Sequence, residues 1–171
     1  MENFTNNSIE IGSLPQFEEV DFQPISESYL IKSYLLKFLL LCAAVIVWVV
    51  LFYYDINLVL TSILAVFIVL YFPFKFWNTF KVQDTYGFAL REKDILFKRG
   101  YFICTTTVVP FNRIQHVSIS RDVLDKYLKI STLKIFTAGG SGSDIIIPGL
   151  TTDLALRLKE ALAVKLTANG L

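Results

Sequence analysis

The run FLLLCAAVIVWVVLFYY, residues 38–54, is followed after one aspartate by INLVLTSILAVFIVLYFPF, residues 56–74, and neither run contains a charged residue. Each run is about 17–19 residues long, and a helix needs about 17–25 residues to cross a hydrocarbon core of about 30 Å. Neither has the polar face that helices of soluble proteins show. A cleaved signal peptide is disfavoured, because the first run begins far from Met1 and a second follows at once. The sequence predicts two transmembrane helices, over about residues 35–54 and 56–76.

The few residues between the two runs force the predicted helices to lie antiparallel as a hairpin. Tyrosines and a tryptophan near the ends of the runs are typical of the membrane interfaces. Lysines flank the open end of the hairpin, whereas its connection carries only Asp55; the lysines are Lys32, Lys37, Lys75 and Lys81. The positive-inside rule then predicts a multi-pass protein of the cell (inner) membrane with both termini in the cytoplasm.

The composition agrees with a membrane protein and excludes other classes. Of the 171 residues, 54% are hydrophobic, and the mean hydropathy is +0.53. The formal net charge is only +1, so no strong positive field indicates a nucleic-acid partner. Cys42 lies in an apolar run and Cys104 in a predicted strand, so both are expected to be reduced thiols.

The first 28 residues carry six acidic side chains and no lysine or arginine. Pro15 and Pro24 would interrupt a helix. One interpretation is a partly disordered acidic tail, and the other is a segment that packs on the following domain; the residues that would make that contact are Phe17, Val20 and Phe22.

The chain after residue 83 has the pattern of a small β domain. Short runs rich in β-branched and aromatic residues are separated by turns, which favours an antiparallel sandwich or partly open barrel; the predicted strands are 86–91, 95–98, 102–109, 114–120, 131–137 and 144–147, with a short helix within 121–129. A terminal helix follows, with Thr151 as its N-cap. Its leucines recur every four residues and predict a stripe that packs on the sheet; they are Leu154, Leu158 and Leu162.

Three short motifs carry a resemblance to a known family: VPFNRIQHV at residues 109–117, TAGGSGSD at 137–144 and IPGL at 147–150. Together with the preceding hairpin, they resemble bacterial membrane proteins with a pleckstrin-homology-like domain. The resemblance implies a membrane-anchored α+β fold, with a β sandwich or barrel of about seven strands and a C-terminal capping helix. We expect an acidic N-terminal arm (1–30), a transmembrane hairpin (31–82) and the pleckstrin-homology-like domain (83–168). The resemblance implies a fold more than an activity.

The candidate interaction residues are polar side chains of the first motif and the end of the second predicted strand: Asn112, Arg113, Gln115, His116, Lys98 and Arg99. In a strand, Arg113 and Gln115 would share one face, opposite His116. They are either a recognition edge for an anionic headgroup or a partner's carboxylate, or structural groups that bind backbone carbonyls at a sharp turn. The glycine-rich segment 138–143 is either a hairpin loop or a phosphate cradle.

No catalytic, cofactor or metal site is expected. His116 is the only histidine, and a zinc site or a catalytic triad needs partners that the sequence does not place beside it. The leading hypothesis is a non-enzymatic, membrane-tethered cytoplasmic interaction or scaffold module. Its expected partners are the lipid bilayer and either another membrane or cytoplasmic protein or a second copy, with no nucleic acid. The alternatives are a component of a transport or pore assembly, and a module that binds an anionic headgroup.

Overall fold

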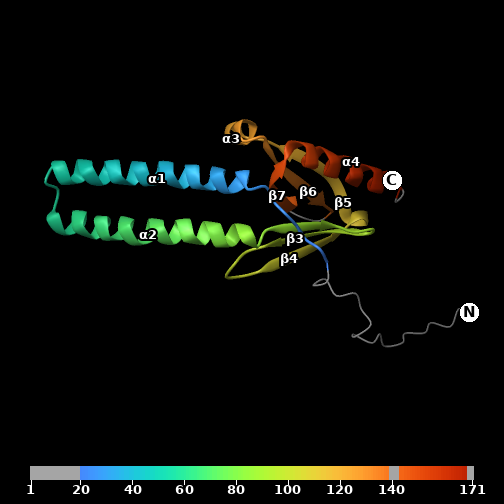
Figure 1. Ribbon diagram of the computed structural model, residues 1–171, viewed down its shortest axis with the longest axis horizontal. Coiled ribbons are helices and arrows are strands. Elements are labelled where there is room, and N and C mark those ends of the chain that lie inside the picture. The colour runs from blue at the N-terminus through green and yellow to red at the C-terminus, as the bar shows by residue number, and fades with distance from the viewer. Residues whose placement is uncertain (1–19, 139–142, 169–171) are drawn as a thin grey trace, which may run out of the picture.

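The computed structural model describes residues 20–138 and 143–168. Two long helices, α1 (Ser28–Tyr53) and α2 (Leu58–Asp84), lie side by side and project from one end of a β domain (Figure 1). At 26 and 27 residues, they are about 39 and 40 Å long. Both exceed the predicted spans at the end that meets the β domain, so the first turns of α1 and the last turns of α2 extend beyond the hydrocarbon core.

The turn between the helices depends on two short polar residues. Asp55 and Asn57 have φ values of 54° and 47°, a left-handed conformation that Asp and Asn tolerate better than most residues. The Asn57 side chain accepts a hydrogen bond from the Val59 amide at 3.1 Å and so caps α2. Nearby, the Trp48 indole donates across the hairpin to the Thr61 carbonyl at 2.9 Å. This bond joins the two helices close to their turn.

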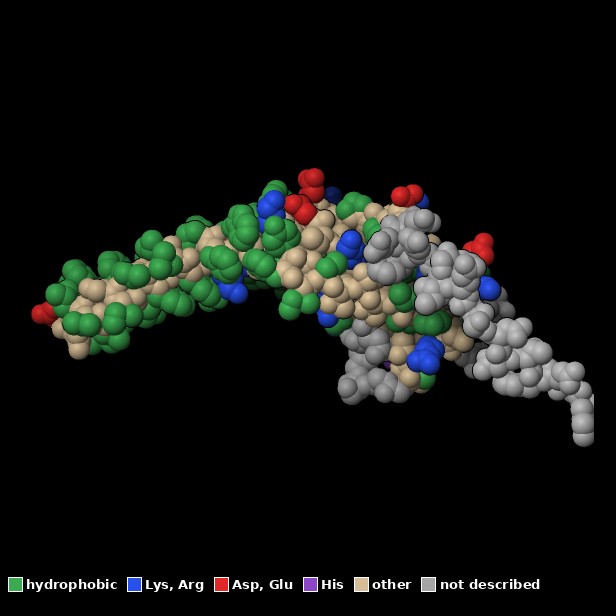
Figure 2. Space-filling model, turned by 90° about the horizontal axis from the view of Figure 1, so that it is seen from below, with side chains coloured by type: hydrophobic (Ala, Val, Ile, Leu, Met, Phe, Trp, Pro, Cys, Tyr) green, Lys and Arg blue, Asp and Glu red, His purple; other side chains and the backbone are tan. Residues whose placement is uncertain are grey.

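The surface of the hairpin is apolar along the two uncharged runs. No residue of α1 is buried, and α2 buries only Thr61 and Phe72. Figure 2 shows hydrophobic side chains covering the hairpin, with basic side chains gathered toward the β domain. A continuous apolar surface of this size is unfavourable in water but suits lipid.

The β domain contains two antiparallel sheets that do not close into a barrel. The first has the order β1 (Gln23–Pro24), β2 (Gly87–Leu90), β3 (Asp94–Arg99), β4 (Thr105–Pro110); the second has the order β5 (Ile114–Ser120), β6 (Ile130–Thr137), β7 (Ser143–Thr151). The predicted sandwich of about seven strands is therefore confirmed. The core between the sheets is aliphatic and aromatic, including Phe88, Phe97, Leu133, Ile135 and Ile147.

Helix α4 (Thr152–Ala168) closes the domain as the sequence predicts. The Thr151 hydroxyl accepts a hydrogen bond from the Leu154 amide at 3.4 Å, which makes Thr151 the N-cap. Leu158 and Leu162 are buried against the sheets together with Ala155. The amphipathic pattern of this helix therefore gave its position correctly.

Strand β1 lies within the predicted acidic arm. It pairs with β2, and the first sheet therefore takes a strand from before the hairpin. Phe22 lies against β2, since a Cβ on Gly87 would come within 2.9 Å of the Phe22 Cβ. Residues 20–27 thus follow the packed interpretation, whereas Phe17 lies outside the described residues.

The predicted strand over 102–109 begins three residues later than expected. Gly100 has φ +98°, and a Cβ there would come within 2.1 Å of the Ile103 carbonyl oxygen. This turn carries residues 101–103 away from the ladder and toward α2, where Tyr101 and Phe102 lie 6.1 and 6.3 Å from the Trp77 ring.

The base of α1 is joined to the β domain at two places. The Ser26 amide donates to the Gly149 carbonyl at 2.8 Å. Gly149 has φ +68°, and an added Cβ would come within 2.5 Å of the Tyr29 Cβ. On the other side, the Lys32 ammonium lies 2.6 Å from a carboxylate oxygen of both Asp122 and Asp125. The glycine of the IPGL motif therefore allows the anchor to approach the sheet.

Candidate functional site

The polar residues of the first motif lie where the first sheet passes into the second. A short 3₁₀ helix, η3 (Phe111–Arg113), joins β4 to β5. Phe111 is buried in the core, and this burial leaves Asn112 and Arg113 exposed on the outside of the turn. In the part of the chain that the structure describes, the Arg113 guanidinium has neither an ion pair nor a hydrogen bond to a backbone carbonyl.

A β-bulge changes how the next residues point. The register of β5 against β6 shifts between Ile114 and His116, so the expected alternation of Arg113, Gln115 and His116 does not hold. Gln115 and His116 are both exposed, and the His116 ring stacks on Phe136 of β6 at 4.1 Å. His116 therefore takes part in a cross-strand ring pair.

The two basic residues of β3 are not part of this cluster. Lys98 and Arg99 pair with the start of β4, whereas η3 follows its end, and the two ends of a six-residue strand are about 17 Å apart. The Lys98 ammonium lies 5.7 Å from the Phe22 ring. In the β2–β3 turn, Arg91 makes two hydrogen bonds of 2.6 Å to Asp94, so that turn has no free arginine. The structure divides the predicted set into two separate groups.

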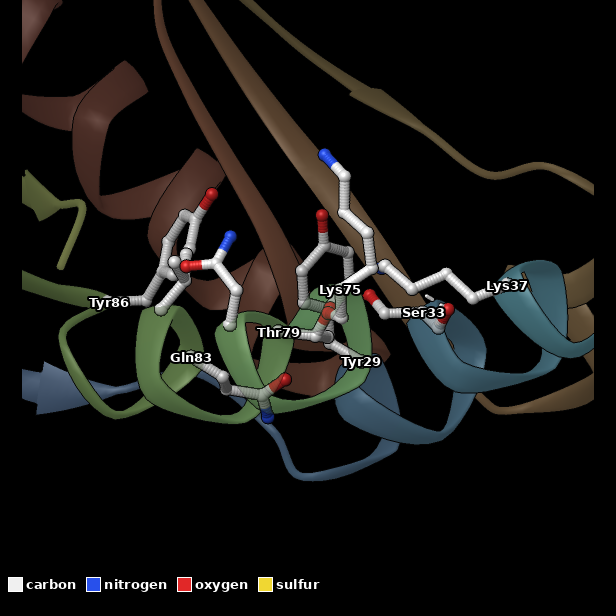
Figure 3. Close-up of a pocket in the computed structure, with 9 residues that line it drawn as sticks. Tyr29, Ser33, Lys37, Lys75, Thr79, Gln83 and Tyr86 are labelled. Atoms are coloured by element: carbon white, nitrogen blue, oxygen red, sulfur yellow. Dashed lines mark hydrogen bonds between the residues drawn. The ribbon is translucent and has the colours of Figure 1, made fainter. Parts of the chain in front are cut away.

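A second candidate site lies between the domain-side ends of the two helices. A cavity of about 210 Å³, called here the helix-junction pocket, is lined by Tyr29, Ser33, Lys37, Lys75, Asn78, Thr79, Val82, Gln83 and Tyr86 (Figure 3). Because a water molecule takes about 30 Å³ in the liquid, the pocket can hold a group of several heavy atoms. The Tyr29 and Tyr86 rings meet edge to face at its domain-side end, 6.3 Å apart.

The pocket is formed by polar faces that the helices have only near the β domain. On α1 its residues recur every four positions, at Tyr29, Ser33 and Lys37; on α2 they recur at three or four, from Lys75 through Asn78, Thr79 and Val82 to Gln83. Residues at these spacings lie on one face of a helix. The two faces are opposed, because residues of both helices line the same cavity.

The charge in the pocket is entirely positive. Lys37 and Lys75 both line it, and none of the nine lining residues that the structure describes is acidic. The Lys37 ammonium has a long contact of 3.4 Å to the Ser33 carbonyl, and the Lys75 ammonium lies 5.3 Å from the Tyr71 ring. Neither contact neutralises a charge.

Two side-chain amide oxygens of the lining residues are buried without a partner in the described chain: Asn78 Oδ1 and Gln83 Oε1. The Gln83 amide nitrogen donates to the Ser26 carbonyl at 3.3 Å, which fixes the orientation of that amide. A buried polar atom without a hydrogen bond is unfavourable by about 1–3 kcal/mol. The residues that line the pocket therefore include two cations and two buried acceptor oxygens that lack donors.

The pocket was not predicted from the sequence. The uncharged runs predict the two helices, but most of the pocket residues lie on the helical turns between these runs and the β domain. The signal was present in the spacing Tyr29, Ser33, Lys37, with Lys75, Asn78 and Gln83 on the antiparallel neighbour. The glycine-rich segment of the second motif lies largely outside the described residues, at 139–142.

Comparison with known proteins places this architecture in a family. A family model described as "Bacterial PH domain" matches residues 28–165, a range that includes both helices, all of β2–β7 and most of α4. The chain belongs to the bacterial PH domain family. It is also similar to the UPF0699 transmembrane protein YdbS of Bacillus subtilis (strain 168), with 33% identity over 104 residues. The aligned region covers 61% of this chain and 58% of that relative. No solved structure matches the chain.

The family and the helices together identify a membrane protein. Both helices are long and apolar enough to cross a bilayer, and in their most apolar windows 0% and 11% of residues are buried. The similar Bacillus protein is named as a transmembrane protein. This bacterial PH domain is thus joined to a transmembrane hairpin.

Proposed function

We propose that this bacterial PH domain protein is a non-enzymatic interaction module, held by its hairpin at the cytoplasmic face of the cell membrane. In this proposal the arm (1–30) and the hairpin (31–82) position the domain (83–168), and the domain binds an extended acidic segment of a protein partner. The lysines at the domain-side end of the hairpin support the cytoplasmic orientation.

One observation supports the partner site: β5 is an edge strand that pairs only with β6 among the described strands. Its outer edge has no ladder partner among the described strands, and addition of a strand to such an edge is a common way in which domains bind extended peptides. Asn112, Arg113, Gln115 and His116 lie exposed beside this edge. The unpaired Arg113 guanidinium suits a carboxylate, because its fork of donors matches two carboxylate oxygens.

Site-specific photo-crosslinking tests the proposal. A photoreactive amino acid replaces Gln115 in the full chain in its native membrane, and Lys159, exposed on α4, is the matched control position. We expect a discrete protein adduct at residue 115 that is absent at residue 159 and severalfold weaker in Arg113→Ala. Equal labelling at both positions, or adducts with lipid alone, would contradict the proposal. An adduct with a second copy of the chain would show that the domain binds another copy of itself and not a different protein.

A further inference from the structure

We propose that the helix-junction pocket binds the headgroup of an anionic phospholipid whose phosphodiester carries a polyol. Lys37 and Lys75 contact the phosphate, and the Asn78 and Gln83 side-chain oxygens accept hydrogen bonds from hydroxyl groups of the polyol. This inference goes beyond the proposed function, because the pocket is separate from the edge of β5 and needs no protein partner.

The position of the pocket favours a lipid. Lys37 and Lys75 immediately adjoin the two uncharged runs, whose lengths of about 25 and 28 Å match the hydrocarbon core. Both ammonium groups therefore lie at the level of the phosphates. From there the pocket extends toward the β domain as far as Tyr29 and Tyr86, which is the direction in which a headgroup extends from its acyl chains.

The electrostatics of the pocket select an anion. Two lysines line the pocket without a carboxylate among the described lining residues, and like charges at one site repel each other unless an anion lies between them. Basic pockets between transmembrane helices on the cytoplasmic side are known sites for anionic headgroups. A zwitterionic headgroup adds no net negative charge and is disfavoured.

The buried amides select the rest of the headgroup. A phosphodiester is an acceptor and leaves Asn78 Oδ1 and Gln83 Oε1 without donors, whereas a hydroxyl group supplies a donor to each. The Gln83 oxygen is fixed in place by the bond from its amide nitrogen to Ser26. The chemistry of the pocket therefore favours a glycerol-type headgroup over a bare phosphate monoester.

Native mass spectrometry of the full-length protein, after incubation with defined lipids, tests this inference. The lipids are phosphatidylglycerol, phosphatidic acid, phosphatidylethanolamine and phosphatidylcholine, and soluble glycerol phosphate is the lipid-free probe. We expect one phosphatidylglycerol retained per chain, ahead of phosphatidic acid and the two zwitterionic lipids. Lys37→Gln with Lys75→Gln should weaken retention about tenfold or more, because each basic residue near the surface contributes to anion binding.

Lys81→Gln is the matched control, since Lys81 is a lysine of the same helix outside the pocket. It should change retention less than twofold. Asn78→Ala should reduce the preference for phosphatidylglycerol over phosphatidic acid while leaving both bound, and this ratio keeps the test decisive if the double lysine variant does not fold.

Three results would overturn the inference: equal retention of zwitterionic lipids, an effect of Lys81→Gln as large as that of the pocket variant, or a preference unchanged by Asn78→Ala. Saturable binding of glycerol phosphate that displaces the lipid at equal concentration would assign the pocket to a soluble ligand and overturn the lipid assignment. Crosslinking at residue 115 is unaffected by these variants, so failure here is distinguishable from failure of the proposed protein interaction.

Discussion

At the scale of single residues, Lys32 connects the membrane anchor to the β domain. Its ammonium lies between Asp122 and Asp125, which also form the capping box of α3 (Val123–Tyr127). Asp125 is only 4% exposed, so this carboxylate depends on Lys32 for compensation of its charge. The ion pairs therefore fix α1 and α3 relative to each other, although Lys32 and Asp122 are 90 residues apart in the chain.

This connection makes a prediction about pH. The hydrogen bond from Lys32 lowers the pKa of Asp122 below its ordinary value, so the stabilisation is complete above pH about 4 and is lost as the pH falls through the lowered pKa. Asp122→Asn keeps a good N-cap residue but removes the charge. We expect its Tm to be about 1–3 °C lower at pH 7, the range for a partly exposed ion pair.

The difference should shrink as the pH falls through the lowered pKa of Asp122, because the carboxyl group is then protonated in both the folded and the unfolded state. Thermal unfolding in nanodiscs between pH 3 and 7 provides the measurement, with Lys126→Met on the exposed side of α3 as the control. A difference that is constant over this range would show that the Asp122 charge does not stabilise the fold.

At the scale of elements, two tips with exposed apolar side chains flank the base of the hairpin. In Figure 1 the β3–β4 turn extends along α2 and helix α3 lies beside α1, both toward the transmembrane end of the domain. Ile103 on the first tip is 81% exposed and Tyr127 on the second is 85% exposed. Tyr101 and Phe102 also lie against Trp77, two residues beyond Lys75. Exposed aromatic groups at this level are typical of the membrane interface.

We therefore expect the β3–β4 tip to insert into the lipid interface. In a chain whose Cys42 and Cys104 are replaced by alanine, a spin label at Ile103→Cys should be relaxed more strongly by a lipid-soluble quencher than by a water-soluble one. A label at Val164→Cys, on the end of α4 far from the hairpin, should show the reverse. Equal accessibility to the water-soluble reagent at both positions would contradict this seating of the domain.

The elements also show how far sequence alone reaches. Periodicity and turn residues gave the hairpin, α3, α4 and most strands, because those signals are local. Strand β1 was not predicted: its two residues carry no strand pattern and are held by pairing with β2, more than 60 residues away. The helix-junction pocket was missed for a related reason, since it exists only where the polar faces of two helices meet.

At the scale of the whole molecule, the features that face the membrane lie at one level. The lysines of the helix-junction pocket, the Trp77 cluster and the Lys32 ion pairs are all within the domain-side turns of the hairpin. The helices extend from there away from the β domain (Figure 1). Because Ser26, Tyr29 and Lys32 join α1 to the domain, the hairpin and the domain are expected to move together. A rigid connection of this kind would hold the edge of β5 at a constant height above the lipid.

That arrangement requires the domain to lie on the cytoplasmic side, as the positive-inside rule predicts. In the same cysteine-free chain, Asp55→Cys in the helix turn should react with a membrane-impermeant maleimide in intact cells. Lys126→Cys, exposed on α3, should react only after the cells are permeabilised. The reverse pattern would place the domain outside the cell. In that case the four lysines at the domain-side end of the hairpin would have had to cross the membrane, and no cytoplasmic partner could reach β5.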